Sequence, residues 1–193
     1  MKTIGILLFE DVELLDFAGP YEVFSVANEL NDFRLFNVFT ISEAGQAIRS
    51  IHGMRVLPDY SIYNCPAIDI LLIPGGDGTQ KVIDNSLLME WILAAFKKSE
   101  ITFSVCSGAR VLAKLGLLDT SEFATHHLVI DDVLSLASGA CINSEKRFVD
   151  NGRIMTSAGI SAGIDLALHI VEKLCGRLVR EKTVTYMEYD IKR

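Results

Sequence analysis

The sequence predicts an α/β fold in which a doubly wound, mostly parallel β-sheet is covered by helices on both faces. Two observations lead to this prediction. Short apolar runs alternate along the chain with segments of helical periodicity, as in sheets built from βαβ units. The apolar runs also lack the alternation of apolar and polar residues that a solvent-exposed strand face produces. The chain has 193 residues, of which 50% are hydrophobic, and this suits one domain over residues 1–193.

Three apolar runs are the predicted central strands. They cover residues 3–9 (TIGILLF), 68–74 (IDILLIP) and 101–105 (ITFSV). Residues 33–58 are predicted to add further strands, with a hairpin through His52 and Gly53. Asn151–Gly152 lies between two β-prone runs and is a strong signal for a second hairpin.

Four helices are predicted from the spacing of apolar residues. They cover residues 20–30, 86–99, 107–116 and 161–176. Pro20 suits the first helical position, and Ser86 is expected to cap the second helix. Gly116 and Gly176 are expected to end the last two helices, because glycine readily adopts the left-handed conformation found there.

Charge and composition argue against several classes of function. The net charge is −7 and no basic cluster occurs, so nucleic acid is not an expected partner. No segment reaches the roughly 20 apolar residues that a membrane helix needs. Acidic residues follow the short apolar run at the N-terminus, unlike in a signal peptide. These features predict a cytoplasmic protein with no membrane partner.

The cysteines and glycines do not indicate a metal or a cofactor. The four cysteines, which form no CxxC pair, are Cys65, Cys106, Cys141 and Cys175. Without a secretory signal they are expected to be reduced thiols rather than two disulfides. They do not combine with the four histidines into a zinc-binding pattern. The segment PGGDG (74–78) matches neither phosphate-binding glycine motif. We therefore expect no metal and no cofactor.

Cys106 lies where a predicted strand meets a predicted helix, and two interpretations of it are open. A sharp strand-to-helix turn lifts a side chain out of the sheet, as at the nucleophile elbow of hydrolases. A helix N-terminus also lowers the pKa of a thiol. Sites in doubly wound sheets lie beyond the carboxyl ends of the strands, where Cys106 is predicted. The alternative is a buried, inert thiol, since free cysteine is often buried.

Further candidates lie close to other strand ends. The glycines of residues 74–78 (PGGDG) let the backbone turn sharply and expose N–H groups that are candidates for holding an oxyanion beside Cys106, although a plain turn is the alternative. Asp16, just before the first predicted helix, is either a capping carboxylate or a proton carrier whose pKa is raised by burial. Of the adjacent His126 and His127, at most one faces a given pocket if the segment is a strand.

Several motifs together resemble the ThiJ/PfpI superfamily, and more closely its isocyanide hydratase-like branch. The resemblance runs from about residue 3 to about residue 190, through LLDFAGPYEVF, IPGGDGT, SVCSGARVLAKLGLLD, ATHH and AGISAGIDLAL. It implies a flavodoxin-like α/β fold, usually in homodimers. The same domain occurs in transcription regulators with an appended helix-turn-helix domain. We expect no such domain in this chain, and therefore no DNA-binding role.

The resemblance also implies roles for individual residues. Cys106 is the implied nucleophile, and Asp16 in the LD-x-x-GP motif is implied to lie beside it. Ser107 stands where threonine is common in that branch and keeps the hydroxyl group. The remaining implied pocket positions are Gly76 as a backbone donor, Asp77 in the same loop, Ile160, and His127 as the family histidine.

These features predict a cysteine-dependent hydratase or hydrolase that acts on a small electrophilic substrate. The leading hypothesis is isocyanide hydration: Cys106 attacks the isocyanide carbon, Asp16 manages the proton, and water releases an N-substituted formamide. The first alternative is an amidase, a peptidase or a glyoxalase-like enzyme, and a peptidase would use a histidine base near Cys106. The second alternative is a non-catalytic redox-sensing or ligand-binding domain, in which Cys106 is oxidised or binds a ligand.

Overall fold

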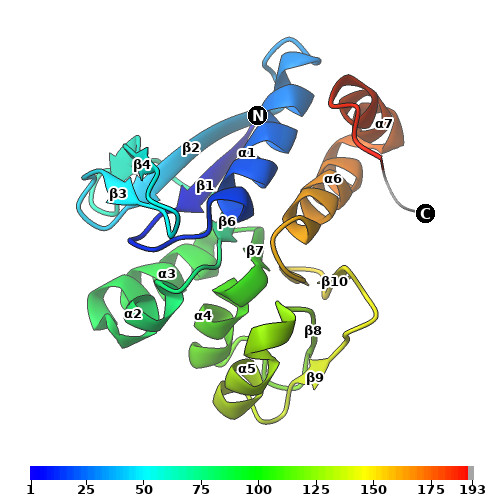
Figure 1. Cartoon of the computed structure of the whole chain (residues 1–193). Helices are drawn as coiled ribbons and strands as arrows, with labels where there is room; N and C mark the ends of the chain where they lie inside the picture. The colour runs from blue at the N-terminus through cyan, green and yellow to red at the C-terminus, as the bar shows by residue number, and fades with distance from the viewer. Residues whose placement is uncertain (191–193) are drawn as a thin grey trace.

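A computed structural model describes residues 1–190, and a seven-stranded sheet forms its centre (Figure 1). The strands are β1 (Lys2–Leu7), β2 (Phe36–Ser42), β5 (Tyr60–Ser61), β6 (Ile70–Ile73), β7 (Ile101–Val105), β10 (Phe148–Asp150) and β11 (Ile154–Ser157). Their order across the sheet is β10-β11-β7-β6-β1-β2-β5. All neighbours run parallel except the edge pair of β10 and β11. The predicted fold class is confirmed.

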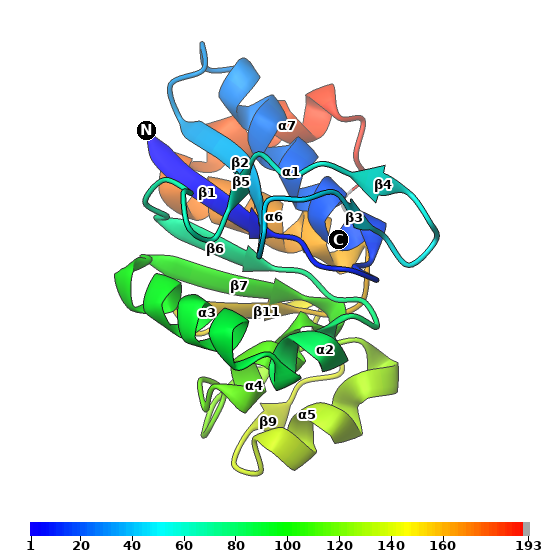
Figure 2. The ribbon, with the colours of Figure 1, turned by 90° about the vertical axis from the view of Figure 1, so that its left-hand side faces the viewer.

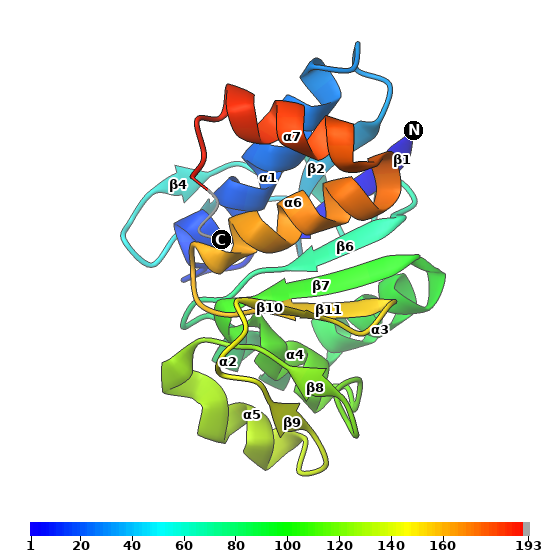
Figure 3. The same cartoon turned by 90° about the vertical axis from the view of Figure 1, so that its right-hand side faces the viewer.

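Helices cover both faces of this sheet, as Figures 2 and 3 show from opposite sides. One face carries α1 (Leu14–Glu29), α6 (Ala162–Cys175) and α7 (Arg177–Tyr186). The other carries α2 (Thr79–Asp84), α3 (Ser86–Lys98) and α4 (Ala109–Lys114), with α5 (Ile130–Leu136) packed against α4. Cover on two sides explains why β6 and β7 are buried along their whole length. None of the helices in residues 1–190 is long and apolar enough to cross a membrane.

Short strands complete the structure, and both predicted hairpins are present. Strands β3 (Ile48–Arg49) and β4 (Arg55–Val56) pair antiparallel around His52 and Gly53. Strands β10 and β11 pair antiparallel around Asn151. A separate parallel pair consists of β8 (Glu122–Phe123) and β9 (Cys141–Ile142).

Helix α1 begins six residues earlier than predicted, at Leu14 instead of Pro20. Pro20 therefore lies inside the helix, and the prediction of a first helical position is wrong. Because Pro20 has no N–H, the carbonyl of Asp16 four residues earlier receives no helical hydrogen bond from it. Close packing against α6 holds this helix: a Cβ placed on Gly19 would lie 2.9 Å from Cγ1 of Ile164.

The other helix ends follow the sequence signals with one exception. Asn85, not Ser86, caps α3, and its side chain accepts a hydrogen bond of 3.1 Å from the N–H of Leu88. Gly116 and Gly176 have φ angles of 70° and 90° and follow the last residues of α4 and α6, as predicted.

The join between β7 and α4 is a sharp turn. Its first residue, Cys106, has a φ angle of 56° and begins a single 3₁₀ turn, η1 (Cys106–Gly108). Gly108 allows the turn to lie against the end of β6, because a Cβ there would be 2.2 Å from the carbonyl oxygen of Ile73 and 2.9 Å from that of Pro74. The lack of a side chain at Gly108 therefore fixes how closely the two strand ends approach.

We predict that Gly108→Ala destabilises the protein by about 3 kcal/mol, since the added methyl group meets backbone atoms that cannot move aside. Gly139→Ala is the matched control, because the nearest atom to a Cβ there is 3.5 Å away. Urea denaturation of both variants provides the measurement. Equal midpoints for the two variants would contradict this account of the turn.

Candidate active site

The candidate site lies at the carboxyl edge of the sheet, where segments from three parts of the chain meet. Cys106 follows β7, Gly75 and Gly76 follow β6, and Asp16 comes from the first turn of α1. A Cβ on Gly75 would lie 2.6 Å from both Asp16 Oδ2 and the backbone nitrogen of Ser107. Glycine at position 75 thus allows these groups to come together.

Asp16 is fully buried and lies in the helix, not before it as a cap. Its Oδ2 accepts a hydrogen bond of 2.9 Å from the N–H of Gly75. Its Oδ1 is buried without a hydrogen-bond partner among residues 1–190. Burial raises the pKa of Asp16 from 3.8 to about 7, because the charged carboxylate has lost its water. The hydrogen bond from Gly75 opposes this shift, and the nearby charge of Glu13 adds to it.

The thiol of Cys106 lies beside the Asp16 carboxyl and is 7% exposed. Burial raises the pKa of Cys106 from 9.0 to about 12, and the negative charge of Asp16 is the second cause. The sequence led us to expect a lowered pKa at a helix N-terminus, so this expectation is wrong. The helix that follows has only six residues, and its dipole does not outweigh the loss of water around the sulfur.

The carboxyl and the thiol can be treated as one titrating pair. One group loses its proton at a pKa of about 7 and the other at about 12. Between these values the pair holds one proton and one negative charge. Moving that proton from sulfur to the carboxylate creates a thiolate beside a carboxylic acid. The pair can therefore supply a nucleophile and a proton donor at the same time.

Ser107 connects the turn to the loop after β6. Its Oγ accepts a hydrogen bond of 2.8 Å from the N–H of Gly76 and lies 3.2 Å from the carbonyl oxygen of the same residue. The N–H expected to hold an oxyanion is thus already engaged. The N–H groups of Ile160 and Ser107 instead donate hydrogen bonds to the Cys106 sulfur, and this partly offsets the rise in its pKa.

Ile160 has a φ angle of 48°, which is unusual for a β-branched residue. The backbone therefore adopts an unfavourable conformation where its N–H approaches the sulfur. The resemblance implies Ile160 as a pocket residue, but no sequence pattern indicates a role for its N–H. The direction of an N–H depends on the backbone angles, which composition and spacing do not reveal.

A pocket of about 280 Å³ opens at Cys106. The candidate residues that line it are Gly76, Asp77, Cys106, Ser107 and Ile160. The other lining residues are Glu13, Ile51, Arg110, His126, Leu128 and Val129. Among the described residues, Asp16 and His127 are absent from this lining and His126 is present; Asp16 is buried behind the Cys106 thiol. This pocket is called the thiol pocket below.

The two histidines do not lie on a strand. Residues 124–126 are irregular, and η2 (His127–Val129) follows. The two rings stack with centroids 4.4 Å apart, so the opposite-face interpretation does not apply. Nδ1 of His126 accepts a hydrogen bond of 3.3 Å from the N–H of Leu128, which assigns the proton of the neutral ring to Nε2. Burial is the main cause of the lowered pKa of His126.

The sequence did not identify Glu13 and Arg110 as site residues. The side chain of Glu13 is only 17% exposed and lines the thiol pocket. Arg110 donates hydrogen bonds of 3.1 Å to Thr79 Oγ1 and to Asp132 Oδ2. Its position four residues after Cys106, one helical turn away, is a signal that could have identified it.

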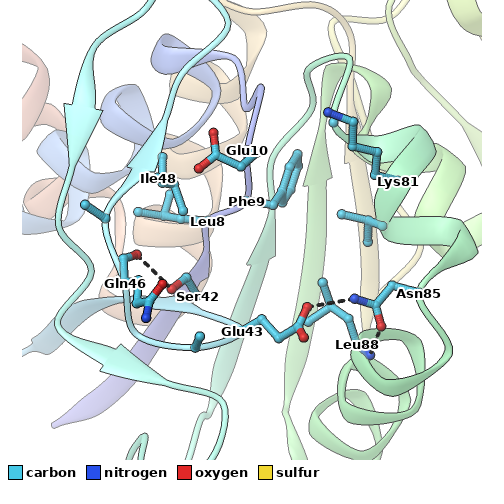
Figure 4. Close-up of a pocket in the computed structure, with 14 residues that line it drawn as sticks. Leu8, Phe9, Glu10, Ser42, Glu43, Gln46, Ile48, Lys81, Asn85 and Leu88 are labelled. Carbon is cyan, nitrogen blue, oxygen red and sulfur yellow. Dashed lines mark hydrogen bonds between the residues drawn. The ribbon is translucent and has the colours of Figure 1, made fainter.

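A second cavity, of about 310 Å³, lies near the ends of β1 and β2 and beside α2 (Figure 4). At its rim Asn85 donates a hydrogen bond of 2.7 Å to Glu43, as Figure 4 shows. Glu10 and Lys81 also line this cavity, which contains no cysteine. No group of three or more histidine, cysteine, aspartate or glutamate residues within positions 1–190 is arranged to hold a metal ion.

The raised pKa of Asp16 predicts a specific dependence of stability on pH. The folded state binds this proton more tightly than the unfolded state does. Stability is therefore highest below about pH 4, falls as the pH rises to about 7, and is constant above that for this group. The shift corresponds to about 4 kcal/mol. Urea denaturation from pH 4 to 8 should show this loss in the wild type and not in Asp16→Asn. If the free energy of unfolding changes with pH in the same way in both proteins, this prediction is contradicted.

Two relatives indicate what this chain is similar to. It is 29% identical to isonitrile hydratase from Pseudomonas putida over 186 residues, which cover 96% of this chain and 78% of that protein. It is 27% identical to the HTH-type transcriptional regulator GbdR from Pseudomonas aeruginosa over 176 residues, or 91% of this chain. The chain spans about half, 47%, of that regulator's length.

A solved structure and a family model agree with these relatives. The crystal structure of a ThiJ/PfpI family protein from Pseudomonas syringae has a TM-score of 0.88 and 25% identity, and it covers 100% of this chain and 76% of the other. The model of the DJ-1/PfpI family matches residues 2–173. With this match over most of its length, the chain belongs to the DJ-1/PfpI family.

Proposed function

We propose that this protein is a cysteine-dependent hydratase that converts an isocyanide into an N-substituted formamide. The observation that carries the proposal is the buried pair of Asp16 and Cys106, with the thiol at a sharp turn that opens into a pocket. Similarity to an isonitrile hydratase over 96% of the chain supports this choice among the reactions of a nucleophilic thiol.

The first step forms a covalent adduct. With the proton of the pair on Asp16, the Cys106 thiolate attacks the terminal carbon of the isocyanide and forms a C–S bond. The carboxylic proton of Asp16 moves to the same carbon, which gives a thioimidate and leaves Asp16 as a carboxylate. Both side chains are buried, so neither charge is strongly solvated, and this favours the proton transfer.

The second step releases the product. A water oxygen adds to the thioimidate carbon, one water proton goes to the nitrogen, and the other returns to Asp16. The C–S bond then breaks, which yields the formamide and restores the thiolate beside a carboxylic acid. The N–H groups of Ile160 and Ser107 stabilise negative charge on the sulfur at both stages.

The alternative functions receive less support. A peptidase would use a histidine base, but His127 does not line the thiol pocket and Nδ1 of His126 already accepts a hydrogen bond. A redox sensor would need a thiolate of low pKa, whereas the pKa of Cys106 is raised to about 12. A glyoxalase-like reaction would use the same thiol. The expected homodimer and cytoplasmic location stay predictions, and light scattering of the purified protein tests the first.

Replacement of the thiol tests the nucleophile. We expect Cys106→Ala to abolish hydration of an aryl isocyanide, measured as formamide release by chromatography. Cys141→Ala is the matched control, because Cys141 is exposed and lies on β9, outside the thiol pocket. Equal activity of Cys106→Ala and the wild type, or no turnover by any of the three proteins, would exclude the proposal.

The titration of the pair predicts the pH profile. The singly protonated pair is the active form, so kcat/KM should rise with pH through about 7 and then stay constant into the alkaline range. Asp16→Asn should lower kcat about 100-fold or more and lose the transition near pH 7, because its side chain neither holds nor accepts the proton. If the transition near pH 7 persists in Asp16→Asn, a group other than Asp16 is responsible for it.

A further inference from the structure

A third pocket, of about 310 Å³, adjoins the thiol pocket. Both pockets are lined by His126 and Ile160, which therefore form the wall between them. The position of His126 depends on Gly159, since a Cβ there would lie 2.3 Å from Cδ2 of the ring. The proposed mechanism makes no use of the third pocket, which is called the basic pocket below.

Within the described part of the chain, the charged residues that line the basic pocket are Lys146 and Arg147, and no acidic residue lines it. Lys146 pairs with Glu122 at 3.0 Å, and Arg147 pairs with Asp165, but both carboxylates lie outside the lining. Side chains of these two cations are about half exposed, so the ion pairs are weak and a ligand anion can compete for them.

Arg147 retains hydrogen-bonding capacity beyond its pair with Asp165. Its Nε contacts Asp165, and its Nη2 donates a hydrogen bond of 3.2 Å to Ser161. A guanidinium group has five N–H donors in a planar fork that matches a carboxylate. Thr125 and Asn143, which also line the pocket, add polar side chains around the same space.

The backbone fixes the spacing between the two pockets. The N–H of Cys106 donates 3.2 Å to the carbonyl oxygen of Ala158, and the N–H of Ala158 donates 2.8 Å to that of Arg147. The three residues thus lie side by side across adjacent chain segments. Because such segments are about 4.8 Å apart, the backbones of Cys106 and Arg147 are separated by about 10 Å. A substituted benzene ring is of similar length, so one small molecule can contact both chain segments.

We propose that the basic pocket binds an anionic substituent of the substrate, so that the preferred substrates are small electrophiles with a carboxylate about one benzene ring away from the reacting carbon. Lys146 and Arg147 hold the carboxylate, while Cys106 attacks the other end. The proposal deepens the hydratase assignment and rests on it for the reaction, whereas the recognition rests on the lining of the two pockets.

Two isocyanides that differ only in the para substituent of one ring test this selectivity. We expect kcat/KM of the wild type to be about tenfold higher for 4-isocyanobenzoate than for 4-methylphenyl isocyanide. The difference should lie in KM and not in kcat. The double variant Lys146→Gln/Arg147→Gln should remove this preference, and 0.5 M salt should reduce it, because exposed charges are screened. Arg55→Gln, on β4 and outside both pockets, removes a positive charge elsewhere and should retain the preference. Equal preference in the double variant and the wild type would overturn the proposal.

A second measurement does not depend on hydratase activity. Alkylation of Cys106 by 4-(bromomethyl)benzoate and by uncharged 4-methylbenzyl bromide, in which the sulfur displaces bromide, is followed by mass spectrometry of the Cys106 peptide. The wild type should react faster with the anionic reagent, and the double variant should not. If this preference holds but no isocyanide is hydrated, the hydratase assignment fails and the anion site stands. If the rates show no dependence on Lys146 and Arg147, the anion site is excluded.

Discussion

The site depends on one contact, between the buried carboxyl group of Asp16 and the thiol of Cys106. Each group alone would be an ordinary acid, but burial raises both pKa values, to about 7 and about 12, and the charge of Asp16 adds to the shift at Cys106. Between these two pH values the pair therefore keeps a single proton. A thiol whose pKa is lowered by a helix N-terminus would be deprotonated, and therefore nucleophilic, at neutral pH. Here the nucleophile exists only when its partner holds the proton, so attack and proton donation are coupled.

The backbone around this pair is built for close approach. Gly75 and Gly108 have no side chains, and the loop after β6 can therefore lie against the turn after β7. The positive φ angles of Cys106 and Ile160 direct one sulfur and one N–H toward each other. These conformations are unfavourable in isolation, and the packed sheet and helices maintain them. The packing of the buried core of the α/β fold thus offsets the free-energy cost of these backbone conformations.

His126 and Ile160 separate two regions with different chemistry. The thiol pocket holds the reacting groups, and the basic pocket holds cations at a fixed spacing from them. Such an arrangement separates reaction from recognition, since changes at Lys146 or Arg147 leave the proton-sharing pair in place. Relatives in one family can in this way keep the thiol and differ in the substituents they accept.

Local patterns in the sequence were enough to predict the central strands, four of the helices, both hairpins and the candidate residues Cys106 and Asp16. Apolar periodicity and turn residues are local, so they can be read along the chain. The folded structure was needed for the direction of the Cys106 pKa shift, the hydrogen bond between Gly76 and Ser107, and the presence of His126 in the pocket. Burial, backbone angles and distances between remote segments control these features, and none of them is encoded in a short stretch of residues.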